Sequence, residues 1–167
     1  HKYAFKRGPF GEVILMACYA VIRVRGRTGI RPDIVKTMDL LNLTRINHCV
    51  LVKGTPQFKG MLQVCKDYVT WGEVEGTVVS KLISKRGRLE GDKRLTEQAL
   101  KETGYSSFDA LAEAVCKGEA TLKKAGIKPV LRLSPPRGGH KNIKSAYPVG
   151  ALGYRGPHIG LLLARMM

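Results

Sequence analysis

Four arginines lie within the stretch Arg23–Arg31, and no acidic residue lies among them. Their guanidinium groups offer planar pairs of donors that match phosphate oxygens. Gly26 and Gly29 allow the backbone itself to approach a phosphate. We therefore expect a phosphate-binding loop after the first strand of the chain. The candidate contacts in this loop are Arg25, Arg27, Thr28 and Arg31.

A second cationic segment runs from Ile127 to Ser145, with five Lys or Arg and no acid. Its centre, "SPPRGGHK" (134–141), cannot form a regular helix or a central strand, because proline lacks an N–H donor and glycine loosens the backbone. The alternative is a flexible linker, but linkers are typically rich in Ser, Glu or Gln rather than in cations. We expect an extended basic arm that a polyanion orders, rather than the core. Its candidate contacts are Arg137, Gly138, Gly139, His140 and Lys141.

A third cationic cluster is diluted by Glu90 and Asp92, so two interpretations stay open for it. The cluster is either a nucleic-acid contact or a solvated charged loop. Its basic residues are Lys85, Arg86, Arg88, Lys93 and Arg94.

Patterns typical of an enzyme or a metal site are weak. The four histidines, His1, His48, His140 and His158, have no sequence neighbours that indicate a triad or a metal pair. The cysteines at 18, 49, 65 and 116 match no zinc spacing, which favours reduced, mostly buried thiols of a cytosolic protein. The glycine-rich stretch "GRTGIRP" lacks the spacing of both common nucleotide-binding loops. We expect no catalysis, no cofactor, no metal and no small-molecule substrate.

The charge balance indicates a polyanionic partner. Among 167 residues, 29 Lys and Arg face 13 Asp and Glu, so the net charge is +16 and the pI about 10.0. Such an excess favours nucleic acid, with an anionic membrane surface as the other candidate. No stretch approaches the roughly 18–20 consecutive apolar residues that a membrane span needs, and no basic helix has a strongly apolar, aromatic face. We therefore expect no membrane association.

Hydrophobic periodicity predicts the elements that position these loops. Strands are expected over 19–25, 48–53 and 69–74, and helices are expected to begin at Pro32 and Pro56, the latter capped by Thr55. The first helix would bury Ile34, Val35, Met38, Leu41 and Leu43, and the second Met61, Val64, Cys65 and Tyr68. The order β-α-β-α-β predicts an α/β (α+β), ferredoxin-like core. Both connections are expected to be right-handed crossovers on one face of the sheet, which leaves the other face open.

The remainder of the chain predicts a helical extension. Helices are expected over 77–87, 95–104 and 106–118, an extended segment over 128–133, and a last helix from Pro157. We divide the chain into an N-terminal extension (1–18), an RNA-binding core (19–75) and a helical and extended C-terminal part (76–167). Two interpretations of residues 1–15 stay open: a leader translated from a misplaced start before Met16, or a basic arm with aromatic residues.

Several motifs, in this order, resemble one family. They are "YAVIRVRGRTGIRPDIVKTMDLLNL", "RINHCVLVKGTPQFKGML", "DYVTWGEV" and "PPRGGHK…GALGYRG". Together they are similar to large-subunit ribosomal protein thirty in its longer archaeal form, whose eukaryotic counterpart is large-subunit ribosomal protein seven. The likeness runs from Tyr19 to Met167. The sequence departs from the family pattern in residues 1–15 and in a last helix with few charges, so we expect that helix to pack on the core.

The resemblance implies a structural constituent of the large ribosomal subunit in the cytoplasm. It implies binding to large-subunit rRNA near the 5S rRNA region, contact with other large-subunit proteins, and neither catalysis nor a cofactor. It carries RNA contacts over to the Arg25–Arg31 loop and to the Arg137–Lys141 segment. It adds two further sets of RNA contacts: Arg45, Asn47 and His48, and Thr55, Lys59 and Gly60.

Two other hypotheses remain from the residues alone. The first is a ferredoxin-like small-ligand or regulatory domain with a basic extension, which would use a pocket at a sheet edge or a dimer interface. The second is a non-ribosomal RNA or DNA binder, which would not accompany ribosomes in one-to-one amounts.

Overall fold

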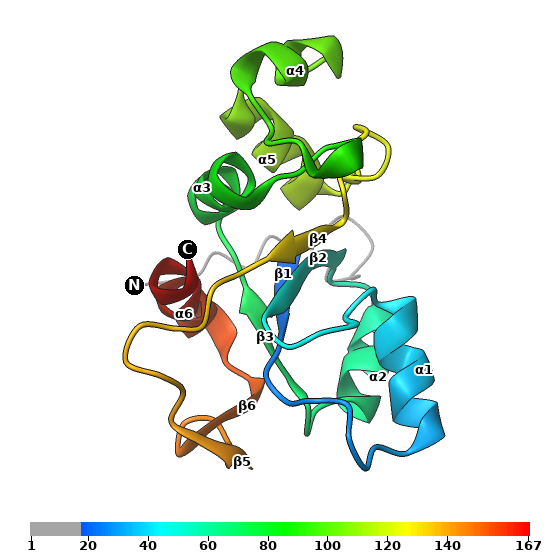
Figure 1. Cartoon of the computed structure of the whole chain (residues 1–167), viewed down its shortest axis with the longest axis vertical. Coiled ribbons are helices and arrows are strands. Elements are labelled where there is room, and N and C mark those ends of the chain that lie inside the picture. Colours follow the sequence, from blue (N-terminus) through cyan, green and yellow to red (C-terminus); the bar gives the residue numbers. More distant parts are fainter. Residues whose placement is uncertain (1–17) are drawn as a thin grey trace, which may run out of the picture.

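The computed structural model describes residues 18–167, so the two interpretations of residues 1–15 lie outside the described part. Its mixed α/β architecture contains the predicted ferredoxin-like core (Figure 1). The strands are β1 (Cys18–Arg23), β2 (His48–Lys53), β3 (Val69–Glu73), β4 (Val130–Arg132), β5 (Asn142–Ala146) and β6 (Gly150–Tyr154). The helices are α1 (Pro32–Leu40), α2 (Pro56–Val64), α3 (Gly76–Arg86), α4 (Glu97–Glu102), α5 (Phe108–Lys117) and α6 (Ile159–Met166). Short 3₁₀ turns, η1 (Glu90–Asp92) and η2 (Gly156–His158), complete the order.

The helix ends follow the local sequence. Pro32 and Pro56 occupy the first helical positions of α1 and α2, where a missing N–H costs nothing. The Thr55 hydroxyl accepts a hydrogen bond from the Phe58 N–H at 3.4 Å, and the Ser107 hydroxyl accepts one from the Ala110 N–H at 3.2 Å. Gly118 ends α5 in the left-handed region, at φ +76°.

The strand order in the sheet is β4-β2-β1-β3-β6-β5, with β1 antiparallel to both β2 and β3. The expectation that both connections are right-handed crossovers is therefore wrong for the first one, because α1 joins two neighbouring antiparallel strands. The second connection, α2, joins β2 to β3 with β1 lying between them. Both helices still lie on one side of the sheet, as Figure 1 shows.

Each face of the sheet carries its own apolar core. Tyr19 and Val21 of β1 pack with Met38 of α1 and Leu62 of α2. Alternate residues of β1, including Ala20 and Ile22, point to the other face. That second face is covered by α3, α5 and α6, so the prediction of an open face is wrong. A three-stranded unit alone would leave it bare, but the C-terminal part of the chain supplies the cover.

The apolar stripes were predicted in part for both helices, because Ile34 and Val35 of α1 are half-buried and Val35 lies outside the core. Met38, Leu41 and Leu43 are buried, whereas Val64 is 47% exposed and the unpredicted Leu62 is fully buried. Val64 is the last residue of α2 and points away from the core. The residues that face the core at this end of the helix are Leu62 and Cys65, which follows the helix. Helix α6 buries Ile159, Leu162, Leu163 and Met166, as expected for a last helix that packs on the core.

The C-terminal part adds strands to both edges of the core sheet. β4 pairs antiparallel with β2, and β6 pairs in parallel with β3. β5 and β6, which the sequence did not predict, extend the sheet beyond β3 with an irregular register. The segments 19–75 and 76–167 thus share one sheet, and their division into separate units stays a prediction.

The basic arm is held by α6 rather than left for a polyanion to order. The Ser134 N–H donates to the Met166 carbonyl at 3.0 Å, and the Arg137 N–H donates to the Arg165 carbonyl at 3.1 Å. In the other direction, the Arg165 guanidinium donates hydrogen bonds to the carbonyls of Arg137, at 2.9 Å, and Gly139, at 2.8 Å. The last carbonyls of a helix lack partners within the helix, and here they receive the arm's N–H groups. The arm is irregular, as predicted, but these hydrogen bonds order it along α6.

Gly72 of β3 is required by a close approach. A Cβ atom there would overlap the Gly156 carbonyl of η2. We expect Gly72→Ala to lower the free energy of unfolding by about 1–3 kcal/mol, as overpacking typically does. Urea denaturation followed by circular dichroism measures this change.

Gly60→Ala is the matched control, because a Cβ on this exposed glycine of α2 meets nothing within 4 Å. Alanine should stabilise the helix at that position by roughly 0.5–1 kcal/mol. Equal stability of the Gly72→Ala variant and the wild type would contradict the packing of η2 on β3.

Candidate nucleic-acid interface

Arg23, at the end of β1, is a structural residue rather than a phosphate ligand. Its side chain is 1% exposed and donates to three backbone carbonyls: Arg25 at 2.8 Å, Leu43 at 2.6 Å and Gly26 at 2.9 Å. Burial, followed by the nearby Arg27, lowers its pKa from the usual value for arginine. The sequence grouped Arg23 with the three arginines that follow but did not include it among the candidate contacts, and the structure shows that it fixes the path of the loop that carries them.

The three arginines in the loop from Arg25 to Arg31 differ in exposure and in the groups that they contact. Arg25 is half-buried, with its guanidinium 5.0 Å from the centre of the Tyr68 ring and within 3.3 Å of the Asp67 carbonyl. Arg27 and Arg31 are exposed and form ion pairs with Asp39, at 3.3 Å, and Asp33, at 3.0 Å. Exposed pairs of this kind contribute little, so a phosphate can replace these carboxylates at small cost.

Thr28 and Gly29 form the exposed tip of the same loop. Gly29 has φ +68°, and a side chain there would meet no atom within 4 Å. The backbone of the tip is therefore accessible to a large partner.

The turn before β2 lies directly beside this loop. The Asn47 N–H donates to the Arg23 carbonyl at 2.9 Å, and the Asn47 carbonyl accepts from the Leu133 N–H at 3.0 Å. Asn47 has φ +63°, a conformation that asparagine tolerates better than most residues. Its backbone thus ties the turn to both β1 and the end of β4, and leaves Arg45 exposed.

His48 is half-buried at the start of β2, with its Nδ1 atom 3.3 Å from the Thr44 hydroxyl. Its pKa is lowered by burial first, and then by Arg132, Arg45 and Arg23. Because all three arginines disfavour the protonated form of His48, the surface around this residue is strongly positive.

Asp92, in the third cationic cluster, forms ion pairs with two basic residues near β4. The Lys128 ammonium lies 2.6 Å from one Asp92 oxygen, and Arg132 of β4 lies 3.4 Å from the other. The hydrogen bond from Lys128 is the largest cause that lowers the pKa of Asp92. Lys93 and Arg94 stay exposed, and Arg88 is half-buried opposite Arg94 in a short antiparallel bridge.

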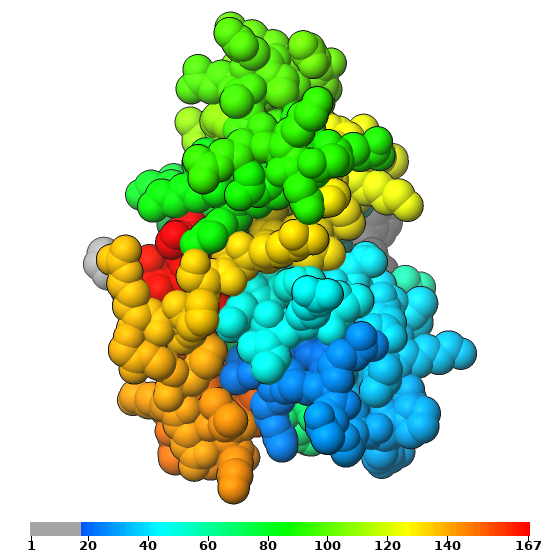
Figure 2. Space-filling view, in the orientation of Figure 1, coloured from blue at the N-terminus to red at the C-terminus, as the bar shows by residue number. Residues whose placement is uncertain are grey.

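Arg132 and Lys128 are functional candidates that the sequence did not single out. Both belong to the extended stretch "KPVLRL", but only the pairing of β4 with β2 shows that Arg132 lies opposite His48. Figure 2 shows the segments around residues 25–30 (blue), 44–48 (cyan), 128–133 (yellow) and 137–145 (orange) on one face. We call the exposed cations around β4 and the loops 25–31, 44–48 and 88–94 the basic face.

Other predicted residues lie away from the basic face. Thr55 caps α2 beyond the far end of β2, and Lys59 and Gly60 are exposed on the same helix. Six strand residues separate this set from the Arg45–His48 turn, a span of roughly 20 Å. The residues carried over from the resemblance therefore form at least two separate groups.

Arg86 supports the arm rather than facing solvent. It is half-buried and donates to the Ser134 hydroxyl at 2.6 Å and to the Met167 carbonyl at 3.0 Å. Lys85, its neighbour in the last turn of α3, is exposed.

The arm presents Arg137, Gly138, Gly139 and Lys141 to solvent and keeps His140 half-buried. The two glycines have φ values of +76° and +72°, which L-residues with side chains rarely adopt. Burial is the largest cause that lowers the pKa of His140, and Arg155 and Arg165 lower it further.

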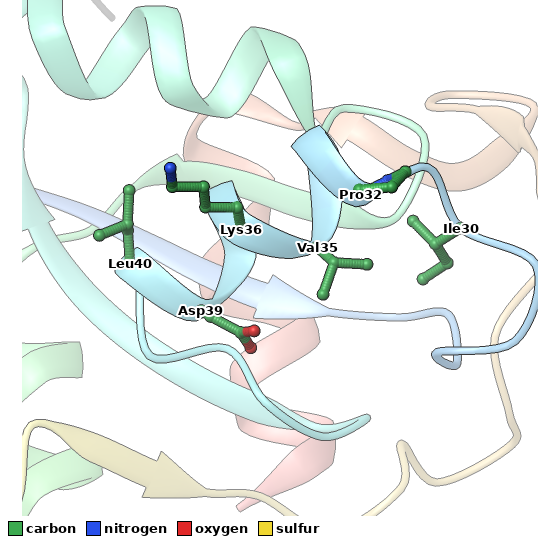
Figure 3. Close-up of a pocket in the computed structure, with 6 residues that line it drawn as sticks. All are labelled: Ile30, Pro32, Val35, Lys36, Asp39 and Leu40. Carbon is green, nitrogen blue, oxygen red and sulfur yellow. The ribbon is translucent and has the colours of Figure 1, made fainter.

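The hollow along α1 offers little to a small ligand. It has a volume of about 600 Å³, is open to solvent, and is lined mainly by apolar side chains such as Ile30, Val35 and Leu40 (Figure 3). Its charged residues are Lys36 and Asp39, and Asp39 already pairs with Arg27. A few convergent polar groups usually fix the orientation of a small ligand, and this hollow supplies few.

The cysteines are free thiols. Cys18, Cys49 and Cys65 are buried and Cys116 is half-buried, as the sequence predicted. Burial raises the pKa of Cys49 to about 12 and that of Cys65 to about 11, which keeps both protonated. Within residues 18–167 no group of three or more His, Cys, Asp or Glu is placed to hold a metal ion. No helix in that range is long and apolar enough to span a membrane.

Comparison with known proteins identifies the family. The family described as ribosomal protein L30p/L7e matches residues 19–69. The "Large ribosomal subunit protein uL30" of Methanosphaera stadtmanae is 52% identical over 151 residues, which cover 89% of this chain and 99% of that protein. The chain belongs to the ribosomal protein L30p/L7e family. Two other relatives of the same name come from Methanococcus vannielii (51% identical; 89% of this chain, 99% of that protein) and Nanoarchaeum equitans (46% identical; 90% and 99%).

Membership in the L30p/L7e family confirms the resemblance that the motifs indicated, including its archaeal form. The family match covers β1 to the start of β3, which is most of the β-α-β-α-β unit that periodicity predicted. A ribosomal protein of this family is a structural protein and not an enzyme, as the sequence led us to expect.

Removal of the Arg23 guanidinium should destabilise the fold. We expect Arg23→Met to lower the free energy of unfolding by about 3 kcal/mol, because it leaves one buried and two partly buried carbonyls without their charged donor. Thermal and urea denaturation measure the loss. Arg27→Met, at an exposed position four residues later, is the control and should change stability by less than about 0.5 kcal/mol. Similar stabilities for the two variants would contradict the structural role of Arg23.

Proposed function

We propose that this chain is a structural constituent of the large ribosomal subunit and that its basic face binds large-subunit rRNA. The observation that carries the proposal is the convergence of three cationic loops and β4 on one face, in a chain about half identical to archaeal large-subunit proteins. Ribosomal proteins of this type work in the cytoplasm by contact, without chemistry on a substrate.

The contact is electrostatic in origin. Arg27, Arg45 and Arg132 are exposed, and each can replace a carboxylate or water with a phosphate oxygen. Neutralised phosphates release counterions, so the affinity should fall steeply with salt concentration. Recognition should follow the shape of the folded RNA, since phosphates and 2′-hydroxyls are what its surface exposes.

The fold would hold several RNA segments in fixed positions. The loop of Arg25, Arg27, Thr28 and Arg31 and the turn of Arg45, Asn47 and His48 would bind one region. The set Thr55, Lys59 and Gly60, at the opposite end of β2, would bind a second region, and the arm with Arg137–Lys141 a third. We place this contact near the 5S rRNA region, with other large-subunit proteins as neighbours, because the family resemblance implies both.

Among the cations between Lys85 and Arg94, one supports the fold and the others are candidates for RNA contact. Arg86 holds the arm, whereas Lys85, Arg88, Lys93 and Arg94 remain candidates for phosphate contact. Asp92, paired with Lys128 and Arg132, would hold these cations in place until RNA competes for them.

Sedimentation tests the ribosomal assignment directly. We expect the chain to sediment with large subunits at about one copy each and to stay bound through a moderate salt wash. Quantitative mass spectrometry of sucrose-gradient fractions measures this ratio. A chain that runs free at the top of the gradient would leave only the other hypotheses, a small-ligand domain or a non-ribosomal binder.

A charge-matched comparison tests the basic face. The triple variant Arg27→Gln, Arg45→Gln, Arg132→Gln should reduce the slope of log affinity against log salt by about 2, since each lost phosphate contact contributes roughly 0.7. Filter binding of an in vitro rRNA transcript at several salt concentrations measures the slope.

The control variant removes three exposed lysines around α4 and α5: Lys101→Gln, Lys117→Gln and Lys124→Gln. Its net charge equals that of the test variant, but its slope should stay close to that of the wild type. Equal slopes for the two variants would show that net charge alone, and not this face, determines binding.

A further inference from the structure

A small cationic cavity lies where the arm meets β6 and α6. Its volume is about 210 Å³. The charged and aromatic side chains that line it are His140, Lys141, Tyr147, Arg155, His158 and Arg165. None of its lining residues is acidic, so the described part of the chain offers no carboxylate inside the cavity to balance these charges.

The guanidinium of Arg155 is fixed in this cavity by contacts on several sides. It lies 4.8 Å from the centre of the Tyr147 ring, which in turn lies 6.0 Å from the His158 ring. Its Nε donates to the Thr70 hydroxyl at 3.4 Å, and its Nη2 donates to the Ala151 carbonyl at 3.2 Å. Its Nη1 has no hydrogen-bond partner among the described residues and remains a donor in a fixed position.

Arg165 is held in a similar way. Its Nε and Nη2 donate to the carbonyls of Arg137 and Gly139 in the arm, while its Nη1 has no such partner in residues 18–167. Two guanidinium groups that line one cavity repel each other unless an anion lies between them, and the nearby Arg165 is among the causes that lower the pKa of Arg155. The same contacts that bind the arm to α6 therefore prepare a positively charged site.

His140 completes the cavity with an unsatisfied polar atom. Its Nε2 is buried and has no hydrogen-bond partner among the described residues. Buried polar atoms without hydrogen-bond partners are rare in folded proteins, and such an atom often binds a group from outside the protein. Lys141, the next residue, is exposed at the edge of the cavity and can reach the same partner.

We propose that this cavity binds one phosphate group of the RNA backbone. Arg155, Arg165 and Lys141 offer donors to its oxygens, a small turn of the His140 ring would bring its buried Nε2 to them, and no lining carboxylate repels the phosphate. The cavity is smaller than the roughly 300 Å³ at which pockets for whole small-molecule ligands begin, so it suits a single group rather than a nucleotide. This inference rests on the proposed rRNA binding and assigns one phosphate to a specific place on the arm.

Inorganic phosphate is the first probe. We would replace sodium chloride with sodium phosphate at constant pH and ionic strength and record the ring signals of the histidines by NMR. The signals of His140 should shift and saturate, whereas those of His48, which lies on the open basic face outside the cavity, should shift more weakly and without saturation. Equal, unsaturating shifts of both histidines would overturn the proposal.

RNA binding by matched variants is the second test. His140→Phe keeps an aromatic ring but loses Nε2, and should weaken binding of an in vitro large-subunit rRNA transcript about tenfold. His140→Gln keeps a polar atom near the Nε2 position and should bind better than His140→Phe. Lys141→Gln should weaken binding more than Lys144→Gln, because both lysines are exposed but Lys144 does not line the cavity.

The outcomes separate this inference from the proposed function. Wild-type binding that is unaffected by His140→Phe, in a variant whose thermal unfolding is unchanged, would overturn the phosphate site and leave rRNA binding standing. Saturation by inorganic phosphate without any effect of the variants on RNA affinity would likewise overturn it, since the site would then take free phosphate alone. No transcript binding by the wild-type chain would overturn the proposed function, and this inference with it.

Discussion

The basic face depends on the hydrogen bonds that the buried Arg23 side chain donates to three backbone carbonyls. Its three hydrogen bonds fix the carbonyls of Arg25 and Gly26 at the start of one loop and that of Leu43 before the next turn. The carbonyl of Arg23 itself accepts the Asn47 N–H, which brings the second turn beside the first. One charged side chain, removed from solvent, thus positions the loops whose other arginines stay exposed.

The central strand β1 explains why this arrangement is rigid. It pairs with β2 and β3 along both edges and has an apolar core on each face. Arg23 is the last residue of that strand, so its backbone is held by the sheet while its side chain reaches the loops. The C-terminal part of the chain contributes to the same rigidity, because α3, α5 and α6 cover the second face of the sheet.

The protein carries a net charge of +16, and the structure shows how the free chain tolerates it. Asp33, Asp39 and Asp92 pair with exposed arginines and lysines of the basic face. These pairs are exposed and therefore weak, which suits the proposed exchange of carboxylates for phosphates. Backbone carbonyls accept hydrogen bonds from other cations, as Arg86 and Arg165 show where they hold the arm.

The sequence determined most of the elements, several of their caps and the buried thiols, because each depends on neighbours within a few positions. Thr55, Ser107 and Gly118 mark helix ends through local hydrogen bonds and backbone freedom, and the strand over 48–53 was predicted at its observed bounds. The motifs with their order were enough to indicate a ribosomal protein.

Only the tertiary structure decided which cations serve the fold and which face solvent. Arg23 and Arg27 look equivalent in the sequence, yet one is buried against carbonyls and the other is exposed. Sequence periodicity also missed β5 and β6, the cover on the second face, and the pairing that sets Arg132 opposite His48. The contact of Arg155 with Thr70 joins residues 85 positions apart, and contacts of that range depend on packing between elements. Local patterns describe each element alone, so they cannot show which side chains the folded chain brings together.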